Sequence, residues 1–358
     1  MKTSYNLAHD LEGRTIGDWL VQKKQPHKSS TGGHFSVGYE AVNIHNGRSG
    51  FLKALDYTSA FNPGVPTVDV LRSMTNAFVF ERDLLHKCKN SRLKYIIRII
   101  DSGNYTLPEE EYPGGGCTYP SVDYMVLEMA DCSMRSIIDL DKALNYSWIL
   151  RSLHNTAVAI EEMHSIQIAH QDIKPSNILL FNNQKISKLG DVGRSSLLGT
   201  PAEHDDYDFA GDRSYSPFEQ LYGFLDPDWK IRRFSCDMFM FGNLVMVYFN
   251  NVSVTQSVLS MLPDKFKPTI WSDTYASILP IIEQVFSECL ASFNKNIDTD
   301  LRQELVEIVK QLCCPDITRR GDLKRKGIGY QQYSLQRYIS KFDLLSRKYE
   351  YQLKKVIS

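Results

Sequence analysis

The chain has 358 residues, which is long enough for one large domain or two modest ones with a sizeable core. Hydrophobic residues make up 42% and charged residues 23%, as in an ordinary soluble globular protein. The formal net charge of −1 gives no global electrostatic reason to expect nucleic acid as a partner, and we predict none.

Cysteine usage and hydropathy indicate the compartment. The seven cysteines are scattered and show no C-x-x-C spacing, which argues against a zinc site or a disulfide framework and favours a reducing environment. The N-terminus lacks a basic segment followed by an apolar one, and the most apolar segment, 238–249, is too short to span a bilayer. We therefore predict a cytoplasmic protein without a membrane partner. The sequence leaves the oligomeric state open.

The first part of the chain, up to about Met129, is predicted to be mostly β-structure. Short runs rich in β-branched and aromatic residues alternate with Gly, Pro and Asn turn signals. One helix interrupts them, because Met74, Phe78 and Leu85 recur at helical spacing. Glu81, three residues after Phe78, falls on the same inward-facing stripe. The predicted strands are 19–21, 35–42, 50–55, 95–100 and 124–127.

After Met129 the pattern becomes helical. Leu150, Leu153, Ala157 and Ile160 form one amphipathic stripe. Further helices are predicted around 238–248, 278–290 and 301–312, and long loops at 104–121 and 194–210. A smaller β-rich part followed by a larger helical part is an α+β organisation.

The most informative stretch is 168–180, which places an acid, a base and an amide at fixed offsets on a loop that enters a strand. Asp172 can accept a hydrogen bond from an attacking hydroxyl, and Lys174 can neutralise a migrating phosphoryl group. Asn177 can hold a divalent cation, and a second acid, Asp191, follows at 188–193. This grouping suits phosphoryl transfer.

These two motifs, His-Gln-Asp-Ile-Lys-Pro-Ser-Asn at 170–177 and Asp-Val-Gly at 191–193, resemble the signatures of the eukaryotic-type (Hanks-type) protein Ser/Thr kinases. The family patterns are His-Arg-Asp-x-Lys-x-x-Asn and Asp-Phe-Gly, so this chain is a variant without arginine before the catalytic Asp. The resemblance implies a bilobal fold that forms one kinase domain. A small β-rich N-lobe with one key helix would occupy 1–129, and a larger, mainly helical C-lobe would occupy 130–358.

The resemblance also implies the activity and the roles of the motif residues. The chain would transfer the γ-phosphate of ATP to Ser or Thr hydroxyls of a protein substrate, with ATP and Mg²⁺ as cofactors. Asp172 and Lys174 would be the catalytic residues, and Asn177 and Asp191 would hold the metal. A lysine two residues after the Asp favours Ser/Thr over Tyr acceptors.

On the nucleotide side, Lys53 stands where the family has the strand lysine that grips the α- and β-phosphates, and Glu81 would be its ionic partner. The stretch 31–41 aligns with the glycine-rich loop if two outer glycines are replaced. Gly33 then keeps the central position, where the backbone approaches phosphate closely.

The same alignment predicts the surroundings of the adenine base. Gly38 replaces a family valine and Phe51 replaces an alanine, which we interpret as a coupled exchange that conserves volume in a packed site. The other adenine contacts implied by the resemblance are the Leu179 side chain below the base, Leu127 at the back pocket, and the backbones of Glu128 and Ala130.

The replacement of the family arginine by Gln171 removes the usual partner of an activation-segment phosphate, so we predict activity without such phosphorylation. Ser195, Ser196 and Thr200 are candidate autophosphorylation sites. The stretch 211–219 resembles the end of an activation segment. Its last residue, Glu219, is predicted to form a buried ion pair with Arg320 that supports the loop.

Two other classes stay open. Small-molecule phosphotransferases of the antibiotic-kinase type share the two acids and the Asn, but Lys174 and the stretch 211–219 argue against them. A catalytically weak pseudokinase scaffold would fit the altered glycine loop, Gln171 and Val192. Against that reading, all five polar positions that the family uses are filled: Lys53, Glu81, Asp172, Asn177 and Asp191.

Overall fold

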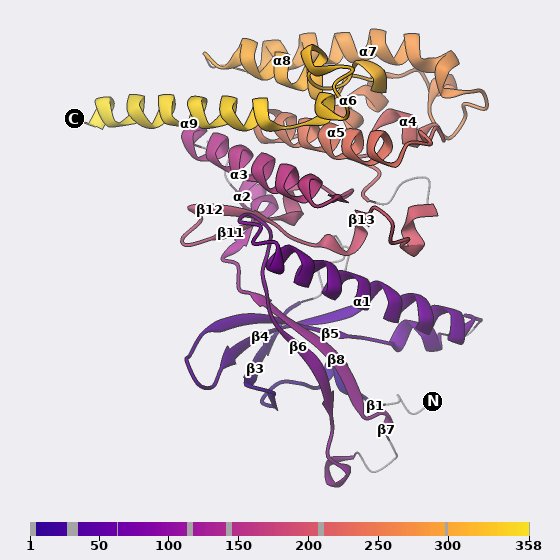
Figure 1. Ribbon diagram of the computed structural model, residues 1–358, viewed down its shortest axis with the longest axis vertical. Coiled ribbons are helices and arrows are strands. Elements are labelled where there is room, and N and C mark those ends of the chain that lie inside the picture. Colours follow the sequence, from indigo (N-terminus) through magenta and orange to yellow (C-terminus); the bar gives the residue numbers. More distant parts are fainter. Residues whose placement is uncertain are drawn as a thin grey trace. The chain divides into compact units, whose positions relative to one another are not determined.

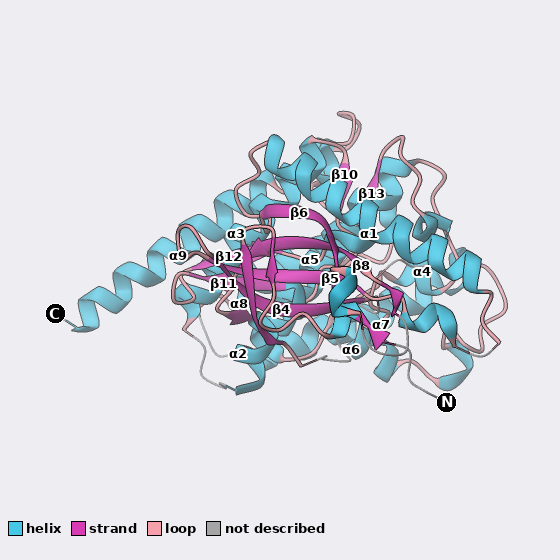
Figure 2. Ribbon diagram, turned by 90° about the horizontal axis from the view of Figure 1, so that it is seen from below, coloured by secondary structure: helices cyan, strands magenta, loops and turns pink. Residues whose placement is uncertain are grey.

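The computed structural model describes residues 5–26, 35–62, 64–112, 117–140, 145–206, 211–297 and 300–357. The chain divides into two compact units. The first comprises Met1–Arg92 and Ile96–Asp131, and the second comprises Leu93–Tyr95 and Cys132–Ser358. The first unit is rich in strands and the second is mostly helical (Figures 1 and 2), as the α+β prediction requires.

The first unit is built on a six-stranded antiparallel sheet with the strand order β2-β3-β4-β5-β8-β6. The strands are β2 (Thr15–Ile16), β3 (Trp19–Lys24), β4 (Ser36–Asn43), β5 (Ser49–Leu55), β6 (Ile99–Thr106) and β8 (Ser121–Glu128). A separate parallel pair joins β1 (Tyr5–Asn6) to β7 (Cys117–Tyr119). One long helix, α1 (Thr67–Asn90), completes the unit.

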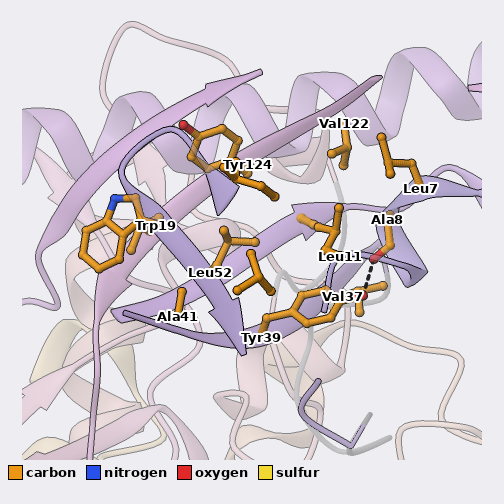
Figure 3. Packing of buried hydrophobic residues seen from close by; sticks show 14 of the residues in the cluster. Leu7, Ala8, Leu11, Trp19, Val37, Tyr39, Ala41, Leu52, Val122 and Tyr124 are labelled. Atoms are coloured by element: carbon orange, nitrogen blue, oxygen red, sulfur yellow. Dashed lines mark hydrogen bonds between the residues drawn. The ribbon is translucent and has the colours of Figure 1, made fainter. Parts of the chain in front are cut away.

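Side-chain alternation along the strands gives the sheet two different faces. Tyr39 of β4 and Leu52 of β5 belong to a buried apolar cluster on one face, together with Trp19 and Tyr124 (Figure 3). The Tyr39 hydroxyl donates a hydrogen bond of 2.8 Å to the carbonyl oxygen of Ala8, which satisfies its buried polar end. Residues 51 and 53 of β5 therefore point to the opposite face.

The predicted helix is confirmed, whereas the bounds of one predicted strand are wrong. Met74, Phe78, Glu81 and Leu85 are all buried on α1. The strand expected at 95–100 begins only at Ile99 and continues to Thr106. Residues 93–95 belong to the second unit, where the Lys94 N–H donates to Glu162 and the Tyr95 carbonyl accepts from Leu189. That segment therefore cannot join the sheet of the first unit.

The second unit is organised around α5 (Trp229–Asn250), in which every residue from Arg233 to Tyr248 is buried. A helix that is buried all round lies in the core of its domain. The Asp228 carboxylate caps its N-terminus by accepting a hydrogen bond from the Ile231 N–H at 3.0 Å. The other helices are α2 (Met134–Leu140), α3 (Tyr146–Ser165), α4 (Phe218–Leu221), α6 (Val254–Met261), α7 (Tyr275–Asn296), α8 (Arg302–Leu312) and α9 (Gln336–Ile357).

Short strands in the second unit position the loops that carry the predicted site. β9 (Cys132–Ser133), β11 (Ile178–Phe181) and β12 (Ile186–Leu189) form a small antiparallel sheet in the order β12-β11-β9. β10 (Ile168–Ala169) pairs with β13 (Ser196–Leu197). The β11–β12 hairpin pairs Ile178 with Leu189, so the residues just before the first strand and just after the second lie at one end of the hairpin.

Among the described residues, α7 is the one helix that is long and apolar enough to cross a membrane by length and composition. The share of its most apolar window that is buried inside the fold is 39%. Its buried residues include Ile278, Ile282 and Phe286, and the helix packs against α6 and α8. The absence of a membrane partner stays a prediction.

Candidate active site

The loop between β10 and β11 brings together the acid, the base and the amide that the sequence singled out. The Asn177 amide donates two hydrogen bonds to Asp172, one to the backbone carbonyl at 2.8 Å and one to Oδ2 at 3.0 Å. The Lys174 Nζ lies 3.0 Å from the same Oδ2. All three side chains are buried. A carboxylate with these partners is held in one orientation within the loop.

A buried carboxylate on α5 supports this loop from below. The Asp237 Oδ2 accepts from the His170 N–H at 2.7 Å, and its Oδ1 accepts from the Gln171 N–H at 2.7 Å. The His164 ring nitrogen Nε2 lies 2.9 Å from Oδ2. Burial alone would raise the pKa of Asp237, but these hydrogen bonds and the nearby histidines lower it on balance. Asp237 therefore holds the loop backbone as an ionised acceptor.

His170 packs in the interior and supports the loop. Its side chain is fully buried, and its Nε2 lies 2.9 Å from the Gly190 carbonyl oxygen. This contact joins the loop 170–177 to the turn that precedes Asp191.

The two predicted metal ligands flank the end of the β11–β12 hairpin. The Gly190 N–H donates to the Asn177 carbonyl at 2.8 Å, which places Asp191 directly after this contact. Asp191 has a left-handed backbone, with a φ of 54°, which is uncommon for residues other than glycine but is adopted by aspartate more often than by most. Within the part of the chain that the structure describes, its half-buried carboxylate accepts no hydrogen bond. Its oxygens are free to meet a cation.

Leu179, the predicted floor of the base site, lies on β11 beside this turn. Its neighbours Ile178 and Leu180 are fully buried, whereas Leu179 itself is half-buried and points the other way. A Cβ placed on Gly190 would come within 2.6 Å of the Leu179 Cδ1. The absence of a side chain at residue 190 therefore leaves room for Leu179.

Gly211 lies against the loop 170–177. A Cβ at residue 211 would come within 2.3 Å of the Gln171 carbonyl oxygen, so only glycine fits there. The next N–H, of Asp212, donates to Asp172 Oδ1 at 3.0 Å, and the Asp212 carboxylate lies 3.8 Å from Lys174 Nζ. Asp212 thus brings a second carboxylate to the cluster.

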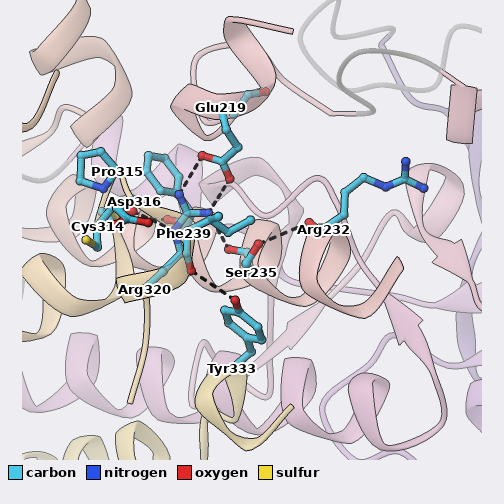
Figure 4. Close-up of polar contacts among 12 residues, drawn as sticks. Glu219, Arg232, Ser235, Phe239, Cys314, Pro315, Asp316, Arg320 and Tyr333 are labelled. Atoms are coloured by element: carbon cyan, nitrogen blue, oxygen red, sulfur yellow. Dashed lines mark hydrogen bonds and ion pairs between the residues drawn. The ribbon is translucent and has the colours of Figure 1, made fainter. Parts of the chain in front are cut away.

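The predicted ion pair between Glu219 and Arg320 is confirmed. The guanidinium binds the carboxylate in a bidentate manner, with N–O distances of 2.6 and 2.8 Å (Figure 4). Arg320 also donates to the carbonyl oxygens of Cys314 and Ser235, so its buried charge is fully surrounded by acceptors. Burial acts to lower the pKa of Arg320, but Glu219 outweighs it and the pKa is raised. Such a pair anchors the end of the segment to the core.

Two of the candidate phosphorylation sites are inaccessible as they lie. Ser195 and Ser196 are completely buried, and the Ser196 hydroxyl donates a 2.6 Å hydrogen bond to Asp205. Thr200 is exposed. The sequence could not distinguish these three hydroxyls, because their burial depends on contacts with residues that follow later in the chain.

In the first unit, Lys53 and Glu81 lie together, as the sequence predicted. The Lys53 Nζ donates to both carboxylate oxygens of Glu81, at 2.8 and 2.6 Å. This contact places α1 on the face of the sheet opposite to the buried apolar cluster. The Lys53 ammonium is thereby held at a fixed position beside β5.

Phe51 and Gly38 also meet on that face. A Cβ placed on Gly38 would come within 2.5 Å of the Phe51 Cζ, so the ring of Phe51 occupies the space that a side chain at residue 38 would fill. Phe51 is half-buried and faces Leu127 across the β5–β8 pair. This geometry supports the interpretation that the two residues were exchanged together.

The remaining predicted nucleotide contacts are Gly33 and the backbones of Glu128 and Ala130. Gly33 lies outside the described residues. The Glu128 N–H already donates to the Arg98 carbonyl at 3.0 Å, so only the carbonyl of Glu128 could meet an adenine edge. Ala130 follows β8 and is half-buried. The binding roles of these residues stay predictions.

Two further residues, Arg233 and Asp205, join the stretch 195–206 to the loop 170–177. The sequence analysis did not identify them. Arg233 lies one helical turn before Asp237 on α5 and hydrogen-bonds both Gln171 and Asp205. The four-residue spacing from Asp237 was a signal in the sequence, because residues i and i+4 share one face of a helix.

The chain matches the family described as "Protein kinase domain" over residues 31–325. Because this range covers most of the chain, the protein belongs to the protein kinase family.

Three relatives illustrate how far the likeness extends. Serine/threonine-protein kinase SBK1 of Danio rerio is 41% identical over 54 residues, which is 15% of this chain and 14% of that protein. Serine/threonine-protein kinase Nek8 of Danio rerio is 28% identical over 175 residues, covering 48% of this chain and 23% of that protein. CTD kinase subunit alpha of Saccharomyces cerevisiae is 24% identical over 209 residues, covering 55% and 38%. The alignments thus span well under half the length of these relatives.

Proposed function

We propose that this protein kinase transfers the γ-phosphate of ATP to serine or threonine hydroxyls of a protein substrate, with Mg²⁺ as the metal. The observation that carries the proposal is the buried cluster of Asp172, Lys174 and Asn177, in which one carboxylate is fixed by a lysine and an amide. Lys174, two residues after the acid, supports serine and threonine as acceptors. The partial relatives named as serine/threonine-protein kinases point the same way.

The chain's own residues would act by position and charge. Asp172, whose carboxylate is fixed by Asn177 and the Asp212 N–H, would accept a hydrogen bond from the incoming hydroxyl and take up its proton. Lys174, which is buried beside it, would stabilise negative charge on the transferring group. Lys53, fixed by Glu81, would bind the nucleotide phosphates.

The residues present fit a magnesium ion. Among the described residues, no group of three or more His, Cys, Asp or Glu side chains could hold a metal by itself. Mg²⁺ needs no such group, because it binds through one or two protein oxygens together with water and substrate phosphates. Asn177 Oδ1 and the unbonded carboxylate of Asp191 supply such oxygens. When bound, the ion would neutralise charge on the phosphates.

The test is the transfer of label from ATP to generic protein substrates in the presence of Mg²⁺. Asp172→Asn is expected to abolish labelling, and Asp300→Asn, an exposed aspartate of the same unit, is expected to leave it unchanged. Nucleotide binding without transfer would instead indicate a pseudokinase scaffold. ATP consumption stimulated only by small metabolites would indicate a small-molecule phosphotransferase.

The proposal includes activity without phosphorylation of the activation segment. It is supported by Gln171, which carries no charge to pair with a phosphate, and by the burial of Ser195 and Ser196. Turnover is expected to be equal before and after phosphatase treatment. A large loss of turnover would overturn this part of the proposal.

A further inference from the structure

Residues 195–206, which follow Asp191 and are called the segment below, are held against the start of α5 by an ion pair between Asp205 and Arg233. The Arg233 Nη2 donates to Asp205 Oδ1 at 2.7 Å and to the Asp205 backbone carbonyl at 3.1 Å. The exposed fraction of the Arg233 side chain is only 3%. Since a buried charge without a partner is strongly unfavourable, Arg233 requires an anion at this place.

The Asp205 carboxylate also gathers the segment itself. Its Oδ1 accepts from the Ser196 hydroxyl at 2.6 Å, and its Oδ2 accepts from the Ala202 N–H at 2.9 Å. The Ser196 hydroxyl in turn accepts from the Trp229 indole N–H of α5 at 3.0 Å. One anion thus ties together two points of the segment and a helix. An activation-segment phosphate orders a loop in the same way, through several charge-assisted hydrogen bonds.

Arg233 reaches the catalytic loop as well as the segment. Its Nη1 donates to Gln171 Oε1 at 3.2 Å, and Gln171 Nε2 donates to the Arg233 carbonyl at 3.0 Å and to Asp237 Oδ1 at 2.8 Å. Gln171 directly precedes Asp172. A continuous path of contacts therefore leads from Asp205 through Arg233 and Gln171 to the catalytic aspartate.

We propose that the Asp205–Arg233 pair is a built-in substitute for a phosphorylated activation segment. The positive charge comes from α5 instead of from the residue before Asp172, and the negative charge comes from a genetically encoded carboxylate. Arg233 and Asp205 are positioning residues: they keep the segment and the catalytic loop in register. The effect on turnover rests on the kinase activity proposed above, whereas the effect on the segment does not.

The first experiment measures amide hydrogen exchange of peptides from 195–206 and needs no activity. In Asp205→Asn, exchange of these peptides is expected to accelerate by roughly tenfold or more, while α5 stays protected. Asp205→Glu keeps the charge and is expected to stay near the parent, as is the exposed control Asp300→Asn. Unchanged protection in Asp205→Asn would overturn the proposal.

The second experiment separates positioning from simple stability. Asp205→Asn with Arg233→Met removes both charges, so no buried charge is left unpaired and the urea midpoint is expected to recover toward the parent. Turnover of protein substrate is nevertheless expected to stay down by roughly tenfold to a hundredfold, the cost of a misplaced catalytic group. The KM for ATP is expected to change little. Recovery of turnover together with stability would overturn the proposal.

The two experiments keep the two proposals apart. If the parent chain transfers no phosphate, the proposed function fails, and hydrogen exchange still decides whether the pair orders the segment. If the parent is active, and Asp205→Asn and the double variant both match it in turnover, the proposed function stands. The proposal that the Asp205–Arg233 pair takes the place of a phosphate is then refuted.

Discussion

The contact between Gly38 and Phe51 makes a sharp prediction about a coupled pair. In Gly38→Val, the new Cβ would meet the Phe51 Cζ at 2.5 Å and Cε2 at 2.9 Å, both closer than real side chains pack. The ring cannot keep its place, and overpacking of this kind costs about 1–3 kcal/mol. Phe51→Ala removes a half-buried ring, so its cost is expected to be about 1–2 kcal/mol, below that of a fully buried Phe.

The double variant restores the valine and alanine of the family pattern. With the ring gone, the valine methyl groups can occupy the vacated space, so we expect the double variant to be more stable than the sum of the single effects by about 1–3 kcal/mol. Urea unfolding of the four chains measures this coupling energy.

Two results would refute the reasoning. Costs that add to within about 0.5 kcal/mol would show that the residues are independent. ATP binding that is tighter in Phe51→Ala than in the parent would show that the ring obstructs the nucleotide, instead of replacing a missing side chain.

Three further outcomes can be measured. Arg320→Met should lower the free energy of unfolding by about 3–5 kcal/mol, because it leaves the buried Glu219 carboxylate unpaired. Arg319→Met, at an exposed neighbour, should change it by at most about 1 kcal/mol. Equal losses in the two variants would contradict a stabilising role of the Glu219–Arg320 pair. Burial lowers the pKa of His204 in the folded chain. As the pH falls, His204 therefore binds a proton in the unfolded chain first, and the stability of the fold should decrease below about pH 6.5. A urea midpoint with the same pH dependence in His204→Gln as in the parent would contradict this. Asp212→Thr removes a carboxylate 3.8 Å from Lys174 and should lower the KM for an acidic peptide by roughly threefold relative to a neutral one; equal changes for both peptides would count against it.

Much of the site was predictable because its residues lie in short motifs. Asp172, Lys174 and Asn177 fall within six consecutive positions, and a hairpin brings Asp191 to them. The partner of Lys53 could be found from helical periodicity, since one acid lay on an otherwise apolar stripe.

The sequence could not reveal contacts that depend on how distant segments pack. Asp205 and Arg233 are 28 positions apart, and neither belongs to a motif. The start of β6 was predicted at residue 95 instead of Ile99 for a related reason. Tyr95 has the composition of a strand residue, but its carbonyl bonds to Leu189 of the second unit, and no local pattern reports that partner.

The arrangement around Asp237 bears on how loss-of-function variants of this chain should be sorted. A single buried acid, Asp237, fixes the backbone of the two residues that precede Asp172. If the proposed kinase activity holds, replacement of Asp237 is expected to abolish turnover as thoroughly as replacement of Asp172, so a screen scored by activity alone would rank the two together. Only a screen that also scores folded abundance could assign one of them to architecture and the other to chemistry.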